Sequence, residues 1–167
     1  IRYIDIPFQH ADDRVLKLMG RKGSREEYLK LINTLKERVK GIAIRSTFIT
    51  GFPGEDDEAF NNLCNFLQDA KLTNAGFFKY SREKDTPSDR LSNHLPTSIK
   101  TKRYKKLYSI QRKISKNNFK SLVGKSFKVL AEGFDYDQFV YYGRAYFNAP
   151  DIDGKVYFFS AEPVEYG

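Results

Sequence analysis

Cysteine is nearly absent from this sequence. Its 167 residues include a single cysteine, Cys64, so the chain can form no internal disulfide bond. One thiolate is also too few for a cysteine-based zinc site or an iron–sulfur cluster, which take several cysteine ligands. We therefore expect no metal site in this chain, and any cluster to be held by residues outside it.

Long apolar runs and an initiator methionine are missing as well. No stretch approaches the roughly 20 apolar residues of a membrane span, and the first residues lack the pattern of a signal peptide. We expect a cytoplasmic protein without membrane contact. Residues 1–6 alternate like a strand already under way, which predicts a piece of a longer protein whose missing N-terminal part matters for function.

Acidic residues are absent from one segment. The chain has 29 lysines and arginines against 21 aspartates and glutamates, a net charge of +8. Residues 1–91 carry a net charge of +2, residues 92–125 hold ten basic and no acidic residues, and residues 126–167 carry −4. The total alone favours a nucleic acid or another anionic partner. The division shows that the excess belongs to one segment and that the last segment is acidic.

The first 91 residues alternate between predicted strands and helices. Strands are expected over residues 1–6, 42–49 and 75–80, with helices between them that begin near Asp12, at Ser24 and before Phe60. Because helices separate the strands, this region predicts an α/β fold with a parallel sheet, in an open or a barrel form.

Two further units are expected to follow. Residues 92–125 predict a basic loop and a long connector helix that starts at Thr97. Residues 126–167 predict a small all-β barrel or sandwich with strands over 127–131, 139–147 and 156–159. Residues 162–167 end where a closing strand is expected, so the module is predicted to be truncated and its barrel open or mobile.

A glycine-rich turn after the second predicted strand is the leading candidate site. Gly51, Pro53 and Gly54 lead into Glu55 and an acidic helix start. Ligands of parallel sheets bind at the carboxyl ends of strands, where glycine lets them approach the backbone. The segment is not a P-loop, because no Lys-Ser/Thr pair follows. An ordinary strand-to-helix turn explains the pattern equally well at this point.

Histidine and cysteine offer weaker candidates. Gln9 and His10 follow the first strand at the same sheet edge, but a single histidine is more often structural or substrate-positioning than catalytic. His94 lies in a polar loop and is expected to be solvated. Cys64 lies on an apolar helix stripe, which predicts a buried side chain rather than a nucleophile.

The basic helix and the acidic module favour opposite partners. The lysines and arginines of the helix can bind phosphate, although a solvated connector with its apolar side packed on a neighbour is the preferred interpretation. The acidic module repels phosphate, and its aromatic residues form either a core or a contact surface.

Motifs spread along the chain resemble the radical S-adenosylmethionine (SAM) methylthiotransferases. They cover residues 3–14 (YIDIPFQHADDR), 45–55 (RSTFITGFPGE) and 80–87 (YSREKDTP). The motifs are specific and run nearly end to end. The resemblance implies that residues 1–91 form the second half of a partial TIM-type (β/α) barrel and that residues 126–167 form a TRAM-like module.

Two features resemble the branch of the family that modifies an aspartate of small-subunit ribosomal protein S-twelve. One is Gln9-His10, where the tRNA-modifying enzymes usually have Gln-Ser, and the other covers residues 143–154. The charge of −4 agrees, because it suits a basic ribosomal protein better than RNA. Arg144 and Tyr146 in the second motif are the candidate substrate-binding residues.

The resemblance also implies cofactors. The whole enzyme would hold two 4Fe–4S clusters through cysteines that this chain lacks, and would use SAM to form the radical that attacks the aspartate β-carbon before the methylthio group is added. This chain is then expected to be inactive alone. The family's cofactor-contacting positions correspond to a set at the strand ends: Gln9, His10, Arg45, Thr47, Gly51, Pro53, Gly54, Glu55, Phe78 and Tyr80.

Two other interpretations stay open. The substrate can be tRNA instead of a protein, with the acidic module as the feature against it. Alternatively, the chain is a non-catalytic RNA- or protein-binding module, which suits the missing cysteines. The oligomeric state and the exact substrate side chain do not follow from the sequence.

Overall fold

The computed structural model describes residues 2–167 and contains two separate three-stranded sheets. The first sheet is parallel, and its order is β1 (Tyr3–Asp5), β2 (Ala43–Thr50), β3 (Asn74–Lys79). The second is antiparallel, and its order is β4 (Leu130–Asp135), β5 (Val140–Arg144), β6 (Val156–Phe158). The helices are α1 (Asp13–Leu18), α2 (Arg25–Arg38), α3 (Asp57–Ala70) and α4 (Thr97–Lys120).

Short polar side chains start the first three helices. Asp12 accepts hydrogen bonds from the first backbone N–H groups of α1, and Ser24 accepts one from Glu27 N at the start of α2. Asp56 does the same for α3 through Ala59 N. These side chains replace hydrogen bonds that the first turn of a helix lacks, which fixes where each helix begins.

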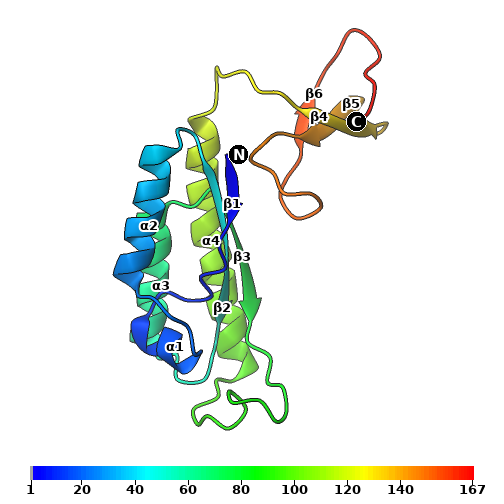
Figure 1. The fold of residues 1–167 in the computed structure, drawn as a ribbon. Coiled ribbons are helices and arrows are strands. Elements are labelled where there is room, and N and C mark those ends of the chain that lie inside the picture. Colours follow the sequence, from blue (N-terminus) through cyan, green and yellow to red (C-terminus); the bar gives the residue numbers. More distant parts are fainter. Residues whose placement is uncertain (1) are drawn as a thin grey trace.

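The three long helices lie on one side of the parallel sheet (Figure 1). Strand β2 alternates, with Ile44 and Phe48 buried beneath the helices and Arg45 and Thr47 on the opposite face. Phe48 packs against aromatic rings from three other segments, those of Phe8, Phe66 and Phe77. No helix within residues 2–167 covers the opposite face, which we call the uncovered face.

Helix α4 packs on the parallel sheet together with α3. Leu107 is fully buried, and the Gln111 side chain donates to the carbonyl oxygen of Leu72, just before β3. The apolar side of this helix is therefore packed on the parallel sheet. Most of its lysines lie on the outer side, exposed to solvent.

The second sheet lies beyond the amino ends of the parallel strands (Figure 1). Its three strands form an open sheet within residues 2–167, so the small all-β barrel predicted for this module is not seen as a closed barrel. Strand β4 begins at Leu130, three positions after the predicted start at residue 127. Phe127 packs instead against Tyr146 and Phe147 at the junction with the first sheet.

Within residues 2–167, no helix combines the length and apolar character needed to cross a lipid bilayer.

Candidate functional site

A buried carboxylate organises the carboxyl end of the parallel sheet. The Glu55 side chain is completely buried and accepts hydrogen bonds from four groups. These are Thr50 Oγ1 and Gly51 N at the end of β2, His10 Nε2 after β1, and Arg103 Nη1 on α4. Burying a carboxylate has a large desolvation cost, which the ion pair with Arg103 and the other hydrogen bonds offset. Glu55 therefore joins three segments that are distant in sequence.

The hydrogen bonds of His10 fix its tautomer. Its Nδ1 accepts from the backbone N–H of Asp12 at 3.0 Å, so Nδ1 carries no proton. The proton then lies on Nε2, which donates to Glu55 Oε2 at 3.1 Å. The imidazole is neutral and completely buried, and both nitrogens are engaged within the chain. Its observed role is to hold the loop after β1 against Glu55.

The glycines of the turn after β2 face side chains of the chain itself. Gly51 and Gly54 have φ values of +79° and +86°, the left-handed region that favours glycine. A Cβ atom on Gly51 would lie 2.5 Å from Lys100 Cγ, and one on Gly54 would lie 2.8 Å from Leu18 Cδ1. Pro53 between them is buried. The turn is thus shaped by backbone conformation and by close packing against α4 and α1.

The uncovered face brings three predicted residues together. Arg45, Thr47 and Ile49 are alternate residues of β2, so their side chains lie on the uncovered face. Phe78 of β3 is paired with Ile49 and therefore lies on the same face. Phe78 is 61% exposed. Gly76 lies opposite Thr47, and a Cβ there would be 3.2 Å from Arg45 Nη2. The missing side chain leaves room beside two polar groups.

Gln9 borders this face through an unusual backbone. Its φ is +69°, and its N–H and C=O bond to Thr47 and Ile49, which continues the pairing of the β1 segment with β2. Neither its side chain nor that of Thr47 makes a hydrogen bond within residues 2–167. Both side chains are half-buried and remain available to a ligand.

Tyr80 lies just after β3 among apolar and basic side chains. Its ring packs against Phe52 with 5.1 Å between ring centroids, and Lys100 lies 5.0 Å from its ring centroid. Lys100 Nζ also donates to the Tyr80 carbonyl oxygen, and burial lowers the pKa of this ammonium. The Tyr80 hydroxyl is buried and has no hydrogen-bond partner in the described residues. His94, which we expected to be solvated, stacks on Tyr80 and is half-buried.

The acidic module reaches the uncovered face through Asp153. One carboxylate oxygen lies 3.5 Å from Arg45 Nε, and the other accepts a hydrogen bond from the Tyr3 hydroxyl. Asp5 on β1 also pairs with Arg45 at 2.6 Å. Burial, followed by the nearby Asp153 carboxylate, raises the pKa of Tyr3 to about 12. Sequence reasoning missed Asp153 and Tyr3, because nothing local connects residues 150 positions apart.

The two predicted substrate-binding residues have partners within the chain. Arg144 pairs with Glu132 on the neighbouring strand β4. The Tyr146 hydroxyl donates to the carbonyl oxygen of Gly41, just before β2, at 2.8 Å. Tyr146 therefore helps to fix the module on the parallel sheet, and a substrate role for either residue stays a prediction.

Metal ligands are not gathered in the described part of the chain. Across residues 2–167, no group of three or more histidine, cysteine, aspartate or glutamate side chains is placed to hold a metal ion. Cys64 is buried on α3, and burial raises the pKa of its thiol to about 11.

Comparison with known proteins assigns both parts of the chain. Residues 1–67 match the radical SAM superfamily, and residues 123–167 match the TRAM domain. Curated relatives named ribosomal protein uS12 methylthiotransferase RimO align along the whole chain. Identity is 41% to the Acetivibrio thermocellus protein over 167 residues, and 45% to those of Desulforudis audaxviator and Clostridium botulinum over 166 and 167 residues. These alignments include 100%, 99% and 100% of this chain but only 37%, 36% and 37% of the relatives.

Proposed function

Because the chain belongs to the radical SAM methylthiotransferase family, we propose that it forms the cofactor- and substrate-facing part of an enzyme that adds a methylthio group to an aspartate of ribosomal protein uS12. The observation that carries this proposal is the alignment of the whole chain with RimO proteins at 41% and 45% identity. The chain spans little more than a third of their length, so the activity is proposed for the whole protein.

We propose that residues 1–91 contribute to a larger partial (β/α) barrel. Parallel strands with helices on one face only are the arrangement of such a barrel, in which the uncovered face would line the interior. The basic loop and connector helix would then be residues 92–125, and the TRAM-like module residues 126–167. The charge boundaries of the sequence support this division.

The polar groups on the uncovered face fit SAM. The free side chains of Gln9 and Thr47 can bond to hydroxyl or carboxylate groups, and the space at Gly76 admits a ligand beside Arg45. The exposed ring of Phe78 suits one face of an adenine, and the unpartnered Tyr80 hydroxyl adds a donor nearby.

The remaining predicted residues would act through the shape of the turn. His10 and Glu55 bond to each other, and Glu55 also holds Gly51 N, so these residues set where the end of β2 lies. Gly51, Pro53 and Gly54 would then present backbone groups rather than side chains to the cofactor.

The cofactors supply the difficult chemistry when bound: SAM and two 4Fe–4S clusters, whose cysteine ligands we place in the remainder of the protein, provide the radical and the methylthio group. The residues of this chain would orient the cofactor and the substrate and enclose them. Asp5 and Asp153 hold the Arg45 guanidinium in one position, and the exposed ring of Phe78 would exclude water from the part of the cavity that it covers when the cofactor is bound.

The acidic module supports a basic protein as substrate. Three aromatic rings line up across its sheet, with centroid separations of 4.9 Å from Phe134 to Tyr141 and 5.6 Å from Tyr141 to Phe158. The module that carries these rings is acidic, since residues 126–167 hold seven acidic and three basic residues. Lysine and arginine side chains bind favourably over such rings and beside such carboxylates. A ribosomal substrate also implies a cytoplasmic enzyme.

The choice of substrate can be tested directly on the full-length protein. The anaerobically reconstituted enzyme would be given SAM and a reductant with either purified uS12 or total tRNA, and the products analysed by mass spectrometry. We expect one methylthio group on an aspartate peptide of uS12 and unmodified tRNA. Modified tRNA with unmodified uS12 would contradict the proposal and favour the tRNA branch of the family.

A further inference from the structure

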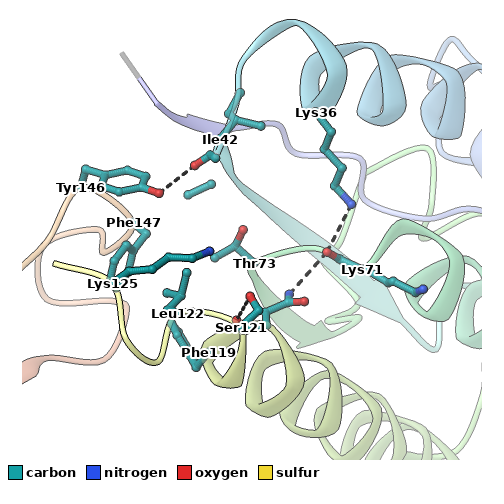
Figure 2. A pocket seen from close by; sticks show the side chains of 13 residues that line it. Lys36, Ile42, Lys71, Thr73, Phe119, Ser121, Leu122, Lys125, Tyr146 and Phe147 are labelled. Carbon is teal, nitrogen blue, oxygen red and sulfur yellow. Dashed lines mark hydrogen bonds between the residues drawn. The ribbon is translucent and has the colours of Figure 1, made fainter. Parts of the chain in front are cut away.

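A basic cleft lies at the amino ends of the parallel strands, where the acidic module meets the first sheet. Two adjoining hollows form it, with volumes of about 360 and 660 Å3, and they share Gly41, Leu122, Lys125 and Tyr146. Figure 2 shows Lys36 and Lys125 reaching toward the first hollow from opposite sides. We call the two hollows together the amino-edge cleft.

The lining of the amino-edge cleft is positively charged. None of its lining residues is acidic, and six are basic: Arg2, Lys36, Arg38, Lys40, Lys71 and Lys125. In the part of the chain that the structure describes, none of these six side chains pairs with a carboxylate. Unpaired like charges repel one another, and a bound anion relieves the repulsion.

Aromatic side chains accompany the cations. The Arg2 guanidinium lies 5.6 Å from the ring centroid of Tyr146, and Phe127 packs beside the same ring. Phe119 at the end of α4 is 39% exposed at the first hollow. Rings beside cations are the arrangement that binds single-stranded nucleic acids, because the rings stack on bases while the cations contact phosphates.

The spread of the cations favours a chain of phosphates over a single one. The six residues come from the segment before β1, from α2 and its end, and from the segments after α3 and α4. Beyond the cleft, α4 continues the charge through exposed Lys113, Lys116 and Lys120. One phosphate ion can contact few of these groups, whereas an extended backbone can contact most of them.

From these observations we propose that the amino-edge cleft binds a single-stranded segment of RNA through its phosphate backbone. The site is distinct from the proposed cofactor face, because it lies at the opposite ends of β2 and β3. The length of β2 separates its amino end from its carboxyl end by about 25 Å. The proposal does not depend on the identity of the modified substrate.

The test measures RNA affinity of the full-length protein by fluorescence anisotropy, with a labelled uridine oligonucleotide of about 12 nucleotides as probe. The double variant Lys40→Glu/Lys125→Glu changes two cleft residues whose side chains make no hydrogen bond within residues 2–167. We expect affinity to fall at least tenfold at about 100 mM salt, and the slope of log affinity against log salt to fall by about 1.4, since each lost contact contributes about 0.7.

The matched control is Lys17→Glu/Lys30→Glu, which makes the same charge change at exposed positions outside the cleft. We expect less than a twofold effect on RNA affinity from the control. An equal loss in both variants, or no binding by the unmodified protein, would overturn the proposal. Equal competition by a poly-glutamate peptide would assign the cleft to an acidic protein segment and would overturn it too.

The same two variants separate this inference from the proposed function. Methylthio transfer to isolated uS12 should be unchanged in Lys40→Glu/Lys125→Glu, because neither lysine lies on the uncovered face or in the acidic module's aromatic row. Loss of RNA binding with unchanged transfer is therefore the expected combination, and transfer lost together with RNA binding would contradict a separate RNA site.

Discussion

Arg103 on α4 and Glu55, in the turn just before α3, form a buried ion pair with 2.7 Å between Nη1 and Oε1. The same guanidinium donates to the Glu55 carbonyl oxygen and to Asp57, so one side chain holds the whole turn after β2. The parallel sheet and the helix from the basic segment are thereby joined at the carboxyl edge, next to the proposed cofactor face.

Removal of the Glu55 carboxylate should be strongly destabilising. Glu55→Ala takes from Arg103 the buried carboxylate of its two acidic partners and removes acceptors from Thr50, Gly51 and His10. We expect a loss of about 3–5 kcal/mol in the free energy of unfolding, measured by urea denaturation. The exposed pair of Arg82 and Asp89 is the control, and Arg82→Ala should cost less than about 1 kcal/mol. Equal losses of unfolding free energy in the two variants would show that burial does not determine how much an ion pair contributes to stability.

Gly51 should tolerate no side chain. In Gly51→Ala, the positive φ costs about 1–2 kcal/mol, and the new Cβ also meets Lys100 at 2.5 Å. Gly20 has a similar φ of +66° but nothing within 4 Å, so Gly20→Ala isolates the backbone term. We expect thermal unfolding at a clearly lower temperature for Gly51→Ala than for Gly20→Ala. Identical melting temperatures for the two variants would show that the contact between a Cβ atom at position 51 and Lys100 of α4 does not destabilise the protein.

Asp153 should fix the acidic module on the parallel sheet. Asp153→Asn removes the negative charge beside Arg45 and weakens the bond from Tyr3, so the amides of residues 145–155 should exchange with deuterium at least about tenfold faster. Asp151→Asn is the control, since Asp151 is exposed and lies in the same loop. If both variants exchange alike, the ion pair does not hold the module.

Cys64 should react slowly with alkylating reagents. Because burial raises the pKa of its thiol to about 11 from 9.0, the thiolate fraction near pH 8 should be about 100-fold below that of a free cysteine. Iodoacetamide labelling of the Cys64 peptide, followed by mass spectrometry, should be slow in buffer and fast in urea. Fast labelling of the folded protein would contradict the buried position.

The same shift gives the sign of a pH effect on stability. A folded pKa above the unfolded value means that only the unfolded thiol ionises between about pH 9 and pH 11. The contribution of Cys64 is therefore complete below about pH 9 and is lost as the pH rises toward 11. Cys64→Ala should reduce the fall in stability across this interval, which urea denaturation at several pH values would measure.

The sequence predicts the elements of the α/β region well because their signals are local. The cap at Ser24 places the start of α2 correctly, and the strands expected over 42–49 and 75–80 lie within one residue of β2 and β3. In the acidic module the start of β4 was wrong by three residues. There the choice between strand and junction for Phe127 depends on Tyr146 and Phe147, which the local pattern does not reveal.

The candidate site was only partly accessible to sequence reasoning. The motifs predict a site at the carboxyl edge of the parallel sheet, but they do not reveal which of the side chains there bond to other groups of the chain. Glu55 and His10 are 45 positions apart and Arg103 is 48 positions beyond Glu55, so their buried network appears only in three dimensions. The sequence pattern does not separate Arg103 from the exposed cations of the basic helix, because no local signal marks it as buried.

The most direct test compares methylthio transfer to uS12 by the full-length enzyme and by its Thr47→Val and Phe78→Ala variants, with Phe159→Ala as the control. Phe159 is 83% exposed in the acidic module, whereas Thr47 and Phe78 lie on the uncovered face. We predict a rate at least about tenfold lower for both face variants, equal to about 1.4 kcal/mol or more of lost transition-state stabilisation, with melting temperatures unchanged. Transfer rates equal to that of the unmodified enzyme would contradict the claim that this face forms the cofactor and substrate cavity.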